Sequence, residues 1–201
     1  MNGLVARRSA VAVLCVLAVW PAWAWAGKPL EGIPLVWKPT NQKHAGVVNL
    51  VGITGLKFRV EPFTDSRPDK KKIAENQEDK VPKPVTTSGD VAQFCTEHFA
   101  ETLRQTGLSI VSEGGDVVIG GEVMEFMVIE TNTYKGEVRL KLTVKRGGNE
   151  GWVGVASGTS SRFGRSYKAE NYYETLSDAL LEAAERAVSD EGFRKASAAE
   201  N

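Results

Sequence analysis

The stretch that decides the fold is GEVRLKLTVKR, residues 136–146, in which apolar and polar side chains alternate. A period of two with one apolar face predicts a β-strand that is buried on one side only. The apolar positions are Val138, Leu140, Leu142 and Val144, and the positions between them are Arg139, Lys141, Thr143 and Lys145. We therefore expect a sheet that contacts the core with one face.

Turn signals flank this strand on both sides and predict its neighbours. Residues 131–136 and the glycine-rich residues 146–151 have the composition of hairpin turns. They predict antiparallel partners at 123–130 and 152–163. Further strands are predicted at 47–53, 56–63 and 108–112. The segment 116–119 is separated from 123–130 by Gly120-Gly121, which predicts a bulge or bend, and the two segments count as one strand.

Two segments show the period of an amphipathic helix. The first begins after Asp90, a capping residue with Gln93 three positions later, and ends at Gly107. The second is predicted over 171–189 with Asn171 as its cap. The order β-β-α-β-β-β-β-α predicts an α+β fold. We expect an antiparallel meander sheet with two amphipathic helices packed on one face, a two-layer sandwich.

The first 26 residues have the layout of a secretory signal peptide. Arg7 and Arg8 precede an apolar core, and the small-residue pattern Ala24-Trp25-Ala26 precedes Gly27. The alternative is a membrane anchor, but the core is short for a span of about 20 residues and contains Pro21. Cys15 lies in mid-core without a lipoprotein signal around it, so no lipid anchor is expected there. We predict cleavage near Ala26 and a periplasmic protein.

The remaining chain divides into three parts by composition. Residues 27–45 hold Pro29, Pro34 and Pro39 and predict an extended N-terminal arm. Residues 46–190 predict a single α+β domain, and residues 191–201, which are small and polar, predict a flexible C-terminal tail.

Charge and cysteine content exclude several classes of function. Loss of residues 1–26 removes two arginines and no acidic residue, which leaves 23 basic and 25 acidic residues and a formal charge of −2. That charge disfavours a nucleic-acid partner, whose binding depends on neutralised phosphates. Cys95 is then the one remaining cysteine, so no internal disulfide is expected, and its place on an apolar helix face predicts a buried thiol.

No motif in the chain predicts catalysis, a metal or a cofactor. Cys95 and His98 share a helix face, but two ligands do not make a zinc site, and the other histidine, His44, lies in the arm. The glycine pairs lie between predicted strands, whereas a phosphate-binding loop leads from a strand into a helix. The serines at 160 and 161 have no histidine partner in the sequence pattern.

Three residues are candidates for a specific role. Asp65 and Arg67 follow the strand 56–63 and open a polar segment, 65–86, whose charges balance. They either fix a turn or form a recognition loop for an envelope partner. Trp37 either anchors a partner from the arm or packs on its own domain.

The order of elements resembles the YajG-like family of bacterial envelope lipoproteins. The resemblance rests on Asp65-Ser66-Arg67, on the helix TSGDVAQFCTEHFAETLRQTG, on the strand GEVRLKLTVKR and on NYYETLSDALLEAAERAV, and it covers about residues 46–190. It implies a periplasm-facing domain of unassigned biochemical role. This chain departs from the family because it lacks a lipobox.

These observations predict a non-enzymatic cell-envelope protein that binds another envelope protein or itself. The alternative is a periplasmic protein that binds a small ligand in a pocket between sheet and helices. A pocket with several convergent polar groups would favour the alternative. An exposed apolar patch or an unpaired strand edge would favour protein binding.

Overall fold

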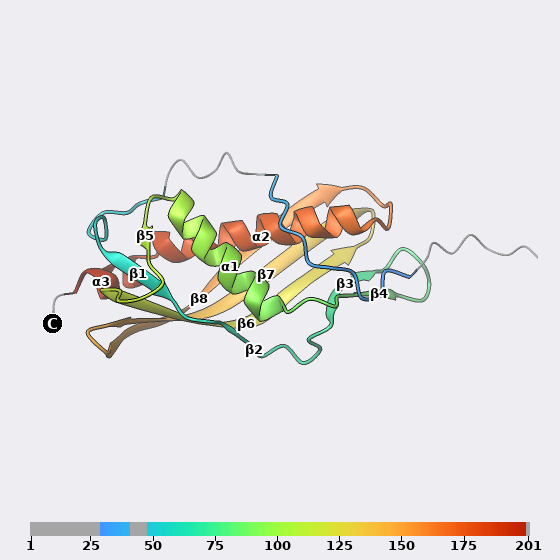
Figure 1. The fold of residues 1–201 in the computed structure, drawn as a ribbon. Coiled ribbons are helices and arrows are strands. Elements are labelled where there is room, and N and C mark those ends of the chain that lie inside the picture. The colour runs from blue at the N-terminus through green and yellow to red at the C-terminus, as the bar shows by residue number, and fades with distance from the viewer. Residues whose placement is uncertain (1–28, 41–47, 200–201) are drawn as a thin grey trace, which may run out of the picture.

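A computed structural model describes residues 29–40 and 48–199. The predicted signal peptide and its cleavage site lie outside these residues. The described chain forms eight strands and three helices (Figure 1), which are β1 Lys57–Val60, β2 Thr64–Asp65, β3 Lys72–Asn76, β4 Lys83–Thr86, α1 Val91–Gln105, β5 Ser109–Ile110, β6 Val117–Glu130, β7 Thr133–Arg146, β8 Asn149–Phe163, α2 Ala169–Ser189 and α3 Glu191–Ala198.

Strands β6, β7 and β8 form an antiparallel unit, and the two hairpins predicted around residues 136–146 are confirmed. Val138 pairs with Phe126 in β6 and with Gly158 in β8. The apolar side chains of β7 are fully buried, while Arg139 and Lys141 are exposed on the other face. Gly120-Gly121 lies within one continuous strand, and the irregularity in pairing falls between Val123 and Glu125 instead.

The prediction of an antiparallel meander is wrong, because the sheet is mixed. Along its other edge, β6 pairs in parallel first with β1, then with β2 and then with β3. Strand β5 pairs in parallel with β1, and β4 pairs antiparallel with β3. Turn residues reveal hairpins, whereas parallel pairs are joined by long crossovers that leave no local signal.

Two segments differ from their predicted structure. The strand predicted at 47–53 is absent from residues 48–53, since a turn over 51–55 contains Gly52 and Gly55 at positive φ. The polar segment 65–86 contains the end of β2 and all of β3 and β4, in which Ile73, Ala74 and Val85 are fully buried.

The described chain has three helices, whereas two were predicted. Helix α1 begins as expected, with the Asp90 side chain accepting from the Gln93 N–H at 3.0 Å. Helix α2 begins at Ala169, after Lys168 rather than after Asn171. The predicted flexible tail contains α3, which Asp190 caps through the Phe193 N–H at 2.9 Å and which Phe193 anchors by complete burial.

The elements form two layers, with α1 and α2 lying side by side over one face of the sheet (Figure 1). Helix α2 approaches β8 closely because Gly158 has no side chain. A Cβ atom there would overlap the Ala179 carbonyl oxygen and the Ala183 nitrogen. The opposite face of the long strands, here called the outer face, is not covered by any of the three helices.

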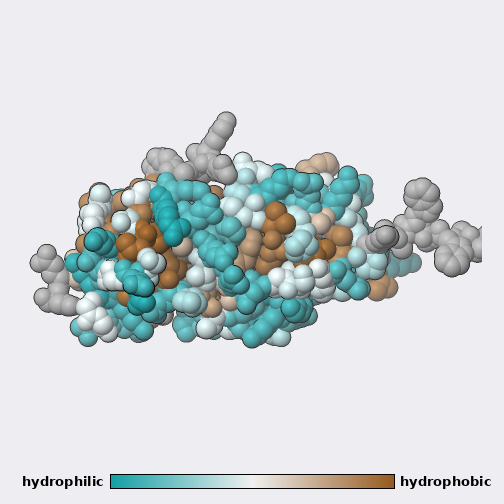
Figure 2. Space-filling view, in the orientation of Figure 1, coloured by the Kyte–Doolittle hydropathy of each residue, from teal (hydrophilic) through white to brown (hydrophobic). Residues whose placement is uncertain are grey.

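The arm, residues 29–40 of the described chain, crosses the helix layer. Ile33 forms a parallel bridge with Thr87, and the Lys38 N–H donates to the Ser177 hydroxyl of α2 at 2.9 Å. Figure 2 shows two apolar areas on this side of the molecule, one near β1 and β5 and one where the arm crosses the helices. The hydrophilic outer side of α1 separates them.

Candidate functional site

The Arg67 side chain is buried and makes five hydrogen bonds that hold the loop after β2. Its guanidinium binds both carboxylate oxygens of Asp65, at 3.0 Å from Nε and 2.8 Å from Nη2. It also donates to the carbonyl oxygens of Lys70 at 2.8 Å, Lys72 at 2.9 Å and Phe126 at 3.4 Å. The side chain is 5% exposed. These bonds use the donors of Arg67 within the chain.

The pKa of Asp65 reflects its ion pair with Arg67. Burial raises the pKa of this carboxyl, but hydrogen bonds from the Arg67 side chain and backbone outweigh it and hold the pKa below its ordinary value. The structure therefore brings together the two residues that the sequence singled out. The hydrogen bonds of Arg67 to Asp65, Lys70 and Lys72 fix the loop after β2, and a role of this loop in recognition stays a prediction.

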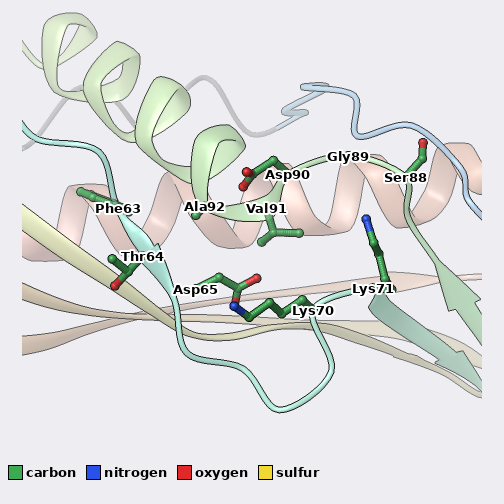
Figure 3. A pocket seen from close by; sticks show the side chains of 10 residues that line it. All are labelled: Phe63, Thr64, Asp65, Lys70, Lys71, Ser88, Gly89, Asp90, Val91 and Ala92. Carbon is green, nitrogen blue, oxygen red and sulfur yellow. The ribbon is translucent and has the colours of Figure 1, made fainter.

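A cleft of about 490 Å³ lies beside this pair, between β2 and the first turn of α1 (Figure 3). Figure 3 shows Lys70 and Lys71 on the loop on one side, and Asp90 and Val91 at the start of the helix on the other. Two of its acidic groups are already engaged, because Asp65 binds Arg67 and Asp90 caps α1. The side chains of Lys70 and Lys71 are the charged groups of the lining that could bind a ligand.

Trp37 packs on its own domain. Its indole stacks on the imidazole of His98, and the ring of Phe94 meets it edge-on with centroids 6.1 Å apart. The structure therefore places this candidate in the seam between the arm and α1, where His98 also binds Glu101 at 3.0 Å.

Cys95 and His98 do not form a reactive pair. Cys95 is fully buried, and burial raises the pKa of its thiol far above the ordinary value. His98 faces Trp37 on the surface of the helix. Within residues 29–40 and 48–199 no cluster of three or more histidine, cysteine or acidic side chains could hold a metal ion.

A buried carboxylate that the sequence did not indicate lies at the end of β6. Glu130 is fully buried and accepts hydrogen bonds from the Tyr172 hydroxyl and from the Tyr167 N–H, the latter at 3.0 Å. Burial and the Glu130 carboxylate raise the pKa of Tyr172. The bonds hold the connection between β8 and α2, where Tyr167 has a φ of 44°. Glu130 and Tyr172 are 42 positions apart, so no spacing pattern could join them.

Among the three long strands of the described chain, β8 has an edge that pairs with no other strand. Strand β8 pairs with β7 alone, so its other side faces no strand in the described chain. On the outer face it carries Val153, Val155 and Phe163, which are 46%, 52% and 92% exposed. An unpaired edge with exposed apolar side chains is a surface on which other chains pair.

Two side chains from α2 form hydrogen bonds with the β8 backbone in the middle of this edge. The Glu182 carboxylate accepts from the Thr159 N–H at 2.5 Å, and Arg186 donates to the Ser157 carbonyl oxygen at 3.2 Å. Glu182 and Arg186 also bind each other at 2.6 Å. The backbone groups of residues 157 and 159 that would bind a further strand are therefore occupied.

The outer face of the sheet holds a shallow groove of about 800 Å³ beside this edge. Its floor includes the half-buried side chains of Met127 and Ile129 from β6. Lys135 and Glu137 of β7 and Thr159 of β8 line it as polar groups. Apolar and charged side chains thus lie side by side on the outer face, which no helix of the described chain covers.

Comparisons with solved structures find neighbours of low sequence identity, among them a lipoprotein. No family model matches the chain, and no curated protein matches it either. A Xanthomonas campestris protein of family DUF330 is 9% identical, with 67% of this chain and 80% of its own covered and a TM-score of 0.43. The PelC dodecamer of Paraburkholderia phytofirmans is 16% identical over 68% and 88%, with a TM-score of 0.40.

A third neighbour is lipoprotein GNA1162 of Neisseria meningitidis, 14% identical over 58% of this chain and 90% of its own, with a TM-score of 0.34. None of these three neighbours is named as a YajG protein. Likeness at this level supports no inference about activity or partners. No helix in the described residues is both long and apolar enough to span a membrane.

Proposed function

We propose that this protein is exported to the bacterial periplasm and acts there as a non-enzymatic module that binds another protein. The observation that carries the proposal is the unpaired β8 edge with Val153, Val155 and Phe163 exposed on the adjoining outer face. Soluble proteins commonly cover or charge such edges, and an uncovered apolar one is a binding surface.

The polar groups of the described chain support the same proposal. Asp65 and Arg67 bind each other, Cys95 is buried, and Glu130 accepts bonds that hold a chain connection. General acid–base or nucleophilic catalysis needs such groups in a cavity, within reach of a substrate. Arg67, Cys95 and Glu130 do not line the cleft beside α1, and Asp65, which does, is bound by the Arg67 guanidinium.

Crosslinking in the native envelope tests the proposal. A photo-reactive residue at position 155 is expected to capture a protein partner, whereas the same residue at position 97, on the exposed side of α1, is not. Capture at neither position, in repeated trials, would overturn the proposal. Export is tested by N-terminal sequencing of the periplasmic protein, where retention of residues 1–26 would refute cleavage.

Small-ligand binding remains a second candidate because of the cleft beside α1. Its lining of Lys70, Lys71 and Ser88 would suit a small anion. This function predicts that an anionic ligand raises the melting temperature of the wild type but not of a Lys70→Ala, Lys71→Ala variant. Equal shifts in both proteins would exclude the cleft.

A further inference from the structure

We infer that β8 pairs with β8 of a second copy of this chain, antiparallel and centred on Gly154, so that two sheets become one. The inference rests on the proposed function and deepens it, because it names the partner and the segment. Addition of a strand to an open sheet edge is a general mode of protein recognition. A two-fold axis that runs between the two β8 strands would make the interface the same on both copies.

The backbone of Val153 and Val155 points toward the open edge. In an antiparallel ladder, successive residues direct their N–H and C=O groups alternately to one side and to the other. The Thr159 N–H and the Ser157 carbonyl point away from β7, since α2 side chains bind them. The β7–β8 register has no irregularity from Trp152 to Phe163, so residues 153 and 155 share that direction.

The other edges of the sheet are closed or short. Beyond β4, which contains Pro84, the arm binds the backbone of Thr86 through Leu30 and Ile33 at 3.0 and 2.9 Å. Strand β5 has two residues. On β8, the Glu182–Arg186 pair closes positions 157 and 159. The first half of β8 is therefore the longest open edge in the described chain.

The first half of β8 is complementary to itself. With the two Gly154 residues opposite each other across the axis, Val153 of each copy faces Val155 of the other, and each such pair exchanges two backbone hydrogen bonds. β-Branched residues opposite each other on an exposed face stabilise strand pairing. At the axis two glycines meet, so no side chain obstructs the close approach of the backbones. The ring of Trp152 covers Gly154 on the inner face, where a Cβ would collide with it.

Charges at the ends of this register are complementary as well. Glu150 is exposed and pairs in register with Lys145 on the outer face. The proposed pairing brings Glu150 of one copy next to Ser157 of the other. Ser157 is flanked by Arg139 in β7 and is bound by Arg186 of α2. The two-fold axis repeats this acidic-to-basic contact, so the interface has two of them.

Light scattering of the purified exported chain over a range of concentrations tests the inference. We expect a dimer, and we expect Val153→Lys or Val155→Lys to raise its dissociation constant about tenfold or more. Val81→Lys is the matched control, because Val81 is 74% exposed but lies outside the sheet. A monomer at every concentration would overturn the inference, as would equal weakening by the control.

Disulfide formation tests the register without depending on a charge. A mixture of Val153→Cys and Val155→Cys proteins is expected to crosslink faster than either alone, because residues 153 and 155 of different copies face each other about 5.5 Å apart. Equal rates in all three samples would overturn the register. If position 155 captures a different protein in the envelope while the purified chain stays monomeric, this inference fails and the proposed function stands.

Discussion

The indole of Trp37 lies parallel to the imidazole of His98, with ring centroids 4.3 Å apart and an interplanar angle of 5°. This contact joins the arm to α1, and the Lys38 N–H bond to Ser177 joins it to α2. The arm thus ties the two helices together on the side away from the sheet. Trp37 serves as an internal anchor of the arm.

Replacement of Trp37 by alanine should therefore loosen the arm. We expect Trp37→Ala to lower the free energy of unfolding by about 2 kcal/mol, less than for a fully buried aromatic residue because Trp37 is half-buried. Urea denaturation measures the loss, and limited proteolysis should show faster cleavage within residues 29–40. Val36→Ala, at a neighbouring exposed position, is the control and should change stability little. Unchanged proteolysis in Trp37→Ala would show that the stack does not hold the arm.

Local signals in the sequence predicted the elements whose partners are near in the chain. The alternation in β7 and the turns beside it predicted the hairpins, and Asp90 with Gln93 predicted the start of α1. Strand β3 was missed because a bulge between Lys72 and Ala74 buries both Ile73 and Ala74 and so removes the period of two. Pro84 in β4 indicated a loop, although proline is accepted at the edge of a sheet.

In the candidate sites, the sequence likewise predicted a contact between near neighbours and missed a contact between distant residues. Asp65 and Arg67 are two positions apart, so their contact could be expected from spacing. Glu182 and Thr159 meet only because Gly158 lets α2 lie on β8, and nothing local connects a helix position with a strand backbone 23 residues earlier. Contacts of this kind follow from the packing of layers.

Asp65→Asn should destabilise the protein at neutral pH, because it leaves the buried Arg67 charge without its carboxylate. We expect a loss of about 3 kcal/mol in the free energy of unfolding at pH 7. The folded-state pKa of Asp65 is lowered, so its contribution is complete above the unfolded value of about 3.9 and disappears as pH falls through the folded value. The difference from wild type should therefore shrink below about pH 4.

Urea denaturation at several pH values measures this difference. Asp79→Asn is the control, because Asp79 is 59% exposed and pairs with Lys83 on the surface. Its effect should stay within about 0.5 kcal/mol at every pH. A pH-independent loss in Asp65→Asn would contradict the assigned ion pair.

Gly158→Ala should force α2 away from β8. A methyl group at this position overlaps backbone atoms of Ala179 and Ala183, which cannot move independently of the helix. We expect a loss of about 3 kcal/mol, at the upper end for overpacked cores. Gly120→Ala is the control, since a Cβ there meets nothing within 4 Å and should be tolerated. Similar melting temperatures for the two variants would exclude the close contact.

Cys95 should not react with thiol reagents in the folded protein. Its burial both shields the sulfur and raises the pKa of the thiol, so the reactive thiolate is scarce at neutral pH. Labelling should become complete in denaturant, and its rate should follow unfolding when denaturant is varied. Fast labelling of the native protein at neutral pH would contradict the burial of Cys95.

Removal of the Glu182–Arg186 pair should extend the open edge of β8. In the double variant Glu182→Ala, Arg186→Ala the Thr159 N–H and the Ser157 carbonyl lose their side-chain partners and become free to bind another strand. We expect assemblies larger than those of the wild type, seen by light scattering, because natural edges without charged cover associate. Glu191→Ala, Lys195→Ala removes a similar pair spaced by four residues on α3, whose side chains are 70% and 75% exposed, and should leave the assembly unchanged. Growth of assemblies in both double variants would point to a general effect of lost surface charge. Growth in neither would show that the ion pair does not limit strand pairing, and that another feature of α2 keeps the second half of β8 from binding a neighbour.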